Sequence, residues 1–173
     1  MTERTPVGFS LTASYDIYQS YQAELREAKD HLEAGRHRDA VGSAQRAWEY
    51  YGEFVLALLG MTKAERRELA QRRQSFGLHD KRSRAYYEER TGDSLSDHPG
   101  WSDLFGSKQL RDTSEHRGKP VTAGQARQAI SIRLDLMHHI DAVLADTAGV
   151  DQAALARARS ARESAYPEEQ PDT

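Results

Sequence analysis

The chain has 173 residues, a size that suits one domain with its own hydrophobic core. It contains no cysteine, which excludes disulfides, thiolate zinc sites and a thiol nucleophile. A net charge of -3 argues against a broad, non-specific nucleic-acid binder. A mean hydropathy of -0.81, with no apolar run of membrane length, predicts a cytoplasmic protein without a membrane partner.

The first sixty residues predict two amphipathic helices. Apolar residues recur at alternating three- and four-residue steps from Tyr18 to Leu32, as on one face of a helix. Ser14 is expected to cap the start of this helix, and Gly35 to end it. A second, more apolar helix is predicted over residues 38–59, with Gly60 as its stop.

A basic third helix is expected to begin after a capping box formed by Thr62 and Glu65, and to end near Gly77. Cations outnumber acids between residues 63 and 84, so this run is either a solvated helix face or an RNA-facing patch. A short helix is predicted around residues 80–90, between glycine and proline breaks.

The second half of the chain predicts three further helices. A short one begins near Trp101, carries Arg111, and is broken at residues 118–120. A capping box of Thr122 and Gln125 starts a long helix that reaches Leu144, and a last helix spans residues 151–164. No alternating pattern typical of strands occurs.

The predicted fold is therefore all-α, an up-down four-helix bundle with inserted short helices and a C-terminal helical extension. The expected organisation is an N-terminal arm over residues 1–13 and a bundle over 14–148 whose segment 62–100 is an insertion. Residues 149–173 are expected to form the last helix and a disordered acidic tail.

The segment before the second capping box combines Arg111, Asp112 and His116. Arginine presents a planar fork of donors that matches phosphate oxygens, and histidine exchanges protons near neutral pH. Other arginine–histidine pairs occur by chance, and two of them lie inside predicted helices. Only Arg111 and His116 lie where one helix ends and the next is capped. The alternative interpretation is that these two cations merely stabilise a helix C-terminus.

The order of these features resembles a HEPN domain, the "higher eukaryotes and prokaryotes nucleotide-binding" helical family. Residues 21–59, including the Leu-Glu-Ala-Gly-Arg turn, are similar to its first two helices, and residues 110–144 to its motif segment and closing helix. Many relatives carry a glutamate followed by a lysine near the end of the second helix. This chain has Glu49 and Glu53 there and no lysine.

The resemblance implies a metal-independent endoribonuclease that works as a homodimer and needs no cofactor. His116 would exchange protons with the 2'-hydroxyl or the leaving 5'-oxygen, Arg111 would hold the phosphate charge, and Asp112 would orient either one. RNA is the implied partner, in a toxin–antitoxin or defence setting that includes a nucleotidyltransferase-type antitoxin. Weaker candidates for RNA binding share a positive charge and are Arg117, Lys119, Arg66 and Arg73.

The alternative function is a non-catalytic HEPN-like module for dimerisation or partner binding, which the negative net charge favours. A DNA-binding regulator ranks third, because no short turn joins two helices with a basic recognition face.

Four further expectations concern single features. His79 is predicted at the surface, the run Arg157 to Arg162 on a solvated face, and Trp101 and Phe105 as anchors of the short helix. His138 and His139 have only Asp135 and Asp141 as acidic residues at suitable spacing, which is too little to predict a metal site.

Overall fold

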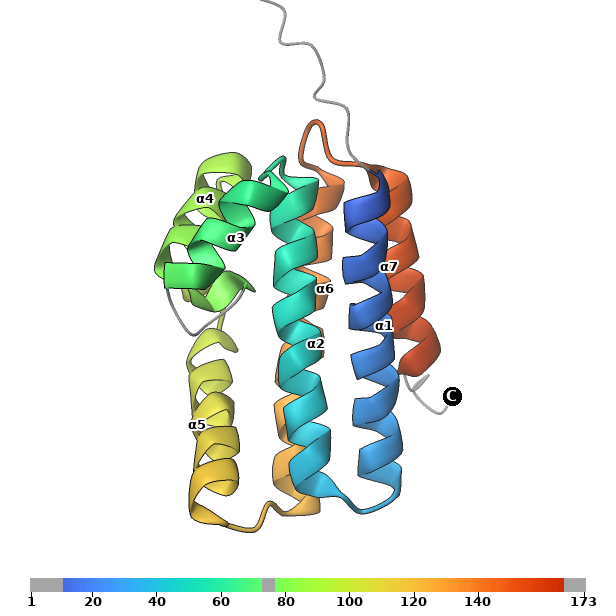
Figure 1. The fold of residues 1–173 in the computed structure, drawn as a ribbon, viewed down its shortest axis with the longest axis vertical. Helices are drawn as coiled ribbons and strands as arrows, with labels where there is room; N and C mark the ends of the chain where they lie inside the picture. The colour runs from blue at the N-terminus through green and yellow to red at the C-terminus, as the bar shows by residue number, and fades with distance from the viewer. Residues whose placement is uncertain (1–10, 73–76, 167–173) are drawn as a thin grey trace, which may run out of the picture.

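A computed structural model describes residues 11–72 and 77–166, and the secondary structure of this part of the chain consists of helices without strands (Figure 1). The all-α prediction is therefore confirmed for the described residues. The Arg73 candidate, the first ten residues and the tail from 167 onward lie outside them. The elements, in chain order, are α1 (Leu11–Glu33), α2 (His37–Leu58), α3 (Lys63–Arg72), η1 (Gly77–His79), α4 (Lys81–Thr91), η2 (Leu95–Asp97), α5 (Trp101–Arg117), α6 (Ala123–Ala145) and α7 (Gln152–Ala165).

The helix starts follow the local capping signals. Thr122 Oγ1 accepts from the Gln125 backbone N–H while the Gln125 side chain accepts from the Thr122 N–H, so the capping box of α6 is complete. Thr62 and Glu65 make the same reciprocal contacts before α3. Asp80 accepts from two backbone N–H groups at the start of α4.

One predicted boundary differs from the structure. Ser14 does not cap the first helix, because α1 is already helical from Leu11 onward. The motif helix α5 extends through Arg117 and ends at the predicted break, so Arg111 and His116 share one continuous helix. Gly118 then ends α5 with a φ of 62°, a left-handed conformation that glycine adopts without a Cβ clash.

Helices α1, α2, α6 and α7 run side by side, and α5 packs outside them against α2 and α6 (Figure 1). The contact between α1 and α2 is the most extensive, and it is lined by Tyr21, Leu25, Trp48 and Tyr51. Within the described residues, no helix is both long enough and apolar enough to cross a bilayer.

Helix α7 belongs to this packing core rather than forming a separate extension. Arg162 is 1% exposed and donates to the buried carboxylate of Asp141 on α6. The hydroxyl of Tyr51 donates to the same carboxylate at 2.6 Å, and burial raises the pKa of that phenol. The prediction of a solvated face is thus wrong for Arg162, although Arg157 and Arg159 are exposed.

The short helix η1 is held close to α2 by two glycines. A Cβ built on Gly52 of α2 would lie 2.8 Å from the backbone nitrogen of Leu78, and one on Gly77 would lie 2.9 Å from the Glu49 carbonyl oxygen. Only residues without side chains permit this approach. It places η1, and with it His79, directly on α2 beside α5.

Candidate functional site

Arg111 of α5 lies against α2, on which its guanidinium approaches Glu49. Its Nη1 atom is 3.9 Å from Oε1 of Glu49, and the two side chains are 26% and 23% exposed. Glu49 therefore reaches the candidate site, although it approaches the arginine rather than the histidine of the motif. Glu53, one turn further along α2, pairs with Arg66 instead, at 3.6 Å.

His116 and Asp112 are exposed on the last two turns of α5. At 3.6 residues per turn, His116 leaves the helix about 140° around its axis from Arg111. The guanidinium consequently approaches α2 while the imidazole lies in solvent. Asp112 is four residues before His116, so these two side chains share a face. The side chains of Arg111 and His116 therefore leave α5 in different directions.

The three weaker candidates that the structure describes divide according to exposure. Arg117 and Lys119 are exposed around the end of α5. Arg66 is 8% exposed, and its guanidinium contacts the Met61 carbonyl and Glu53, so it is not part of an outward-facing basic surface. Its assignment to RNA binding is corrected on that ground, because a phosphate outside the protein cannot replace these inward contacts.

Behind Arg111 lies a polar network that the sequence did not indicate. Arg133 of α6 is 1% exposed and donates to Oε1 of Gln45, to the hydroxyl of Ser107 and to the Ala129 carbonyl. The amide nitrogen of Gln45 donates to Oε1 of Glu49 at 2.8 Å. Burial lowers the pKa of Arg133 to about 10, with Glu49 opposing and Arg111 adding to that shift. The network therefore links α6 through α2 to Arg111.

His79 is buried beside this network, which corrects its expected surface position. Its Nε2 atom is 3.1 Å from the Gln45 amide nitrogen, which is a donor, so Nε2 accepts and the ring proton resides on Nδ1. Burial, together with the charges of Arg133, Lys108, Arg84 and Arg111, lowers the pKa of His79 to about 3. The ring is thus a neutral acceptor surrounded by cations.

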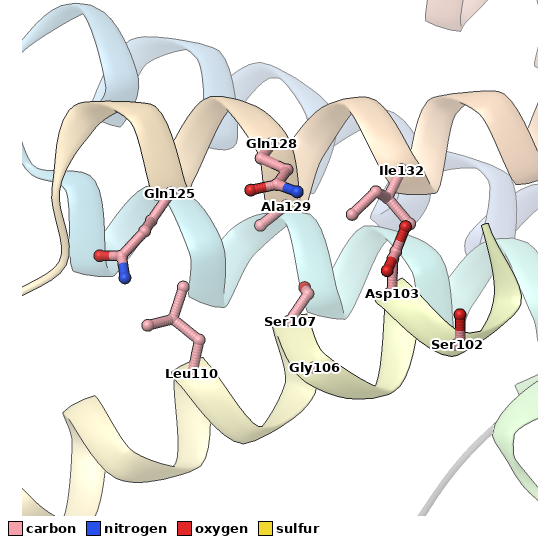
Figure 2. A pocket seen from close by; sticks show the side chains of 9 residues that line it. All are labelled: Ser102, Asp103, Gly106, Ser107, Leu110, Gln125, Gln128, Ala129 and Ile132. Atoms are coloured by element: carbon pink, nitrogen blue, oxygen red, sulfur yellow. The ribbon is translucent and has the colours of Figure 1, made fainter.

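An open groove runs between α5 and α6, with a volume of about 410 Å³ (Figure 2). Hydroxyl and amide groups line it together with small and apolar side chains, namely Ser102, Asp103, Gly106, Ser107, Leu110, Gln125, Gln128, Ala129 and Ile132. Ser107 connects the groove to the buried network, since its hydroxyl accepts from Arg133.

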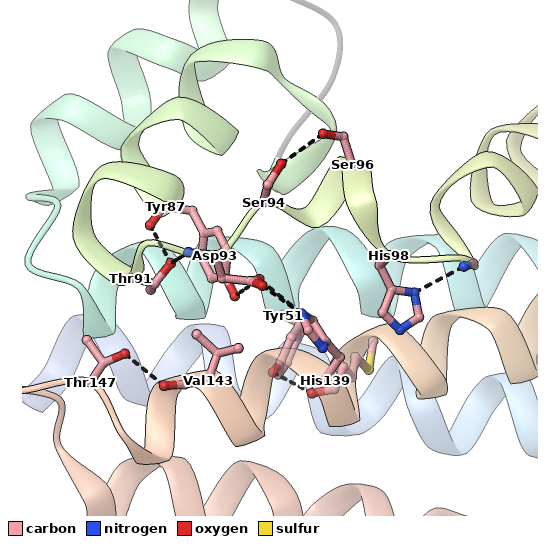
Figure 3. A network of polar contacts seen from close by, with 12 residues as sticks. Tyr51, Tyr87, Thr91, Asp93, Ser94, Ser96, His98, His139, Val143 and Thr147 are labelled. Carbon is pink, nitrogen blue, oxygen red and sulfur yellow. Dashed lines mark hydrogen bonds and ion pairs between the residues drawn. The ribbon is translucent and has the colours of Figure 1, made fainter.

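A second polar cluster lies nearer the other end of α6 (Figure 3). Both carboxylate oxygens of Asp93 lie within 3.1 Å of Nε2 of His139, and the Tyr87 hydroxyl donates to Asp93 at 2.8 Å. The His98 ring stands 4.9 Å from that of His139. Within residues 11–72 and 77–166, no group of three or more histidines and acids is arranged to hold a metal ion. The cluster therefore ties the segment before α5 to α6.

Comparison with known proteins adds no relative, since no family model, curated protein or solved structure matches this chain.

Proposed function

We propose that this protein is a metal-independent endoribonuclease of the HEPN type that acts as a homodimer on RNA in the cytoplasm. The observation that carries the proposal is the arrangement on α5. One arginine is steadied by Glu49 at the edge of the buried network, and one histidine is exposed on the final turn of the same helix. We interpret α1, α2, α6 and α7, which run side by side, together with α5, as a HEPN-like bundle.

In the proposed reaction the RNA supplies its own nucleophile, the 2'-hydroxyl. His116 takes the proton of that hydroxyl or protonates the leaving 5'-oxygen, a contribution worth about 10² to 10⁴ in rate. Arg111 stabilises the charge that builds up on the pentacoordinate phosphate. Asp112, on the same face of α5 as His116, orients the imidazole. The products are a 2',3'-cyclic phosphate and a 5'-hydroxyl.

Two copies are required because Arg111 and His116 diverge around α5 by about 140°. In a symmetric dimer, the arginine of one chain and the histidine of the other approach a shared cleft from opposite sides. Arg117 and Lys119, exposed next to His116, bind flanking phosphates.

The test is cleavage of a labelled single-stranded RNA by purified protein with and without a chelator. Wild type is expected to cleave equally in both, leaving 2',3'-cyclic phosphate ends, while His116→Ala and Arg111→Ala lose at least about 10²-fold. Arg157→Ala, an exposed arginine on α7, is the matched control and retains activity. Full activity of His116→Ala would refute the proposal.

A non-catalytic HEPN-like module that binds a partner is the second candidate, and the observation favouring it is the inward position of Arg66, which removes one cation from the basic run. In a toxin–antitoxin setting, with a nucleotidyltransferase-type antitoxin as partner, the two candidates predict different phenotypes. Growth arrest by wild type but not by Arg111→Ala supports the nuclease. Equal tolerance of both proteins, with the dimer retained, supports the module.

A further inference from the structure

Phe105 on α5 is the large hydrophobic side chain that remains exposed among the described residues, at 41%. Two other rings nevertheless pack against the inner side of the Phe105 ring. The Trp101 ring lies 5.5 Å away at 83°, and the His79 ring lies 6.1 Å away at 67°, both edge-to-face arrangements. Trp101 is 7% exposed, so its role as an anchor of α5 is confirmed, whereas Phe105 presents much of its ring to solvent.

Cations surround this aromatic cluster. The guanidinium of Arg84 lies 5.0 Å from the centre of the Trp101 ring and donates to the His79 carbonyl at 2.6 Å. Lys108 is half-buried one turn after Phe105 on α5, close enough for its charge to act on His79. An exposed ring flanked by cations is a combination that binds single-stranded nucleic acid, where bases stack and phosphates are neutralised.

The ring is also aligned with the candidate histidine. Eleven residues separate Phe105 from His116, which places them about 20° apart around α5 and about 16 Å apart along it. A few nucleotides of an extended strand cover that length. Asp112, between them on this face, carries a negative charge, so the phosphates must follow the side of the helix where Lys108 and Arg111 lie.

We propose that Phe105 is a base-stacking platform for single-stranded RNA, and that Lys108 and Arg84 hold the adjoining phosphates. This inference rests on the proposed function, because RNA is its substrate. It assigns the strand a course along α5, from the Phe105 ring toward His116. The 410 Å³ groove between α5 and α6 lies on a different side of the helix and is not needed for it.

The test measures binding of fluorescein-labelled, 2'-O-methylated single-stranded RNA to the full chain by anisotropy. Such an RNA lacks the nucleophilic hydroxyl, so binding is recorded whether or not the protein cleaves. Phe105→Ala is expected to weaken binding by about 5- to 100-fold, the range seen for loss of one stacked base. Phe105→Trp restores it, and Phe105→Leu, apolar but without a π-face, does not. Lys108→Ala reduces the salt dependence of binding.

Unchanged affinity of Phe105→Ala, or full affinity of Phe105→Leu, would overturn the platform, as would absence of binding by wild type. A loss of dimer in Phe105→Ala on sedimentation, with the affinity per chain retained, would instead assign the ring to a protein contact. Arg157→Ala is the distant control. The cleavage assay tests the proposed function separately. If wild type cleaves RNA but Phe105→Ala binds it as tightly as wild type does, only the stacking platform is refuted. If Phe105→Ala binds RNA more weakly but His116→Ala cleaves it at the full rate, only the proposed catalytic role of His116 is refuted.

Discussion

The carboxylate of Glu49 on α2 lies 3.9 Å from the guanidinium of Arg111 on α5, and the same oxygen accepts the amide proton of Gln45. Gln45 is itself held by Arg133 from α6. The orientation of Arg111 thus depends on three side chains outside the arginine–histidine motif. Any reaction that uses Arg111 should be sensitive to each of them.

Glu49→Gln tests the nearest of these contacts. The glutamine keeps an oxygen for Gln45 but removes the charge that steadies Arg111, so we expect RNA cleavage to fall by about tenfold or more. The free energy of unfolding should change by less than about 1 kcal/mol, since the pair is partly exposed. Glu53→Gln is the control, because Glu53 pairs with Arg66. An equal loss of activity in the two variants would contradict a specific role for Glu49.

Replacing Arg133 tests the buried end of the network. Arg133→Ala leaves the Gln45 oxygen and the Ser107 hydroxyl without their donor and opens a cavity, so we expect the free energy of unfolding to fall by about 3–5 kcal/mol. Arg133→Met fills most of the space without burying a charge and should cost clearly less. Urea denaturation measures both values. Two small and equal losses would show that the network does not stabilise the fold.

The burial of His79 predicts a pH-dependent stability. Its pKa is about 3 in the folded protein and about 6.5 when unfolded, so the unfolded chain takes up the proton first. The free energy of unfolding should therefore fall as the pH decreases from about 6.5 toward 3, and this residue should contribute no slope above that range. Between pH 6.5 and pH 5, wild type should lose about 2 kcal/mol more than His79→Gln. Parallel pH profiles for the two proteins would argue against a buried neutral imidazole.

Substitution of two arginines on α7 tests whether this helix is anchored to the core through Arg162. Arg162→Ala leaves the buried carboxylate of Asp141 without its cation, and we expect a loss of about 3–5 kcal/mol in unfolding free energy. Arg159 approaches the same carboxylate at 3.8 Å, but its side chain is 44% exposed, so Arg159→Ala should change stability by about 0.5 kcal/mol at most. Comparable effects in both variants would mean that α7 is not anchored through Arg162.

The sequence by itself determined the positions of the helices and most of their ends. The capping boxes of Thr62 with Glu65 and of Thr122 with Gln125, and the stop at Gly118, act through backbone groups within four residues, so a local pattern suffices to predict them. The same local logic drew attention to Arg111 and His116.

Only the tertiary structure decided which polar side chains are buried and with what. Gln45 and Arg133 are 88 positions apart, and His79 lies under Phe105 because Gly52 and Gly77 allow η1 to approach α2. Helical periodicity indicates the face from which a side chain leaves, but not which helix covers that face. Arginine and histidine are usually exposed, so their burial is foreseeable only when the partners that compensate their polar groups are known.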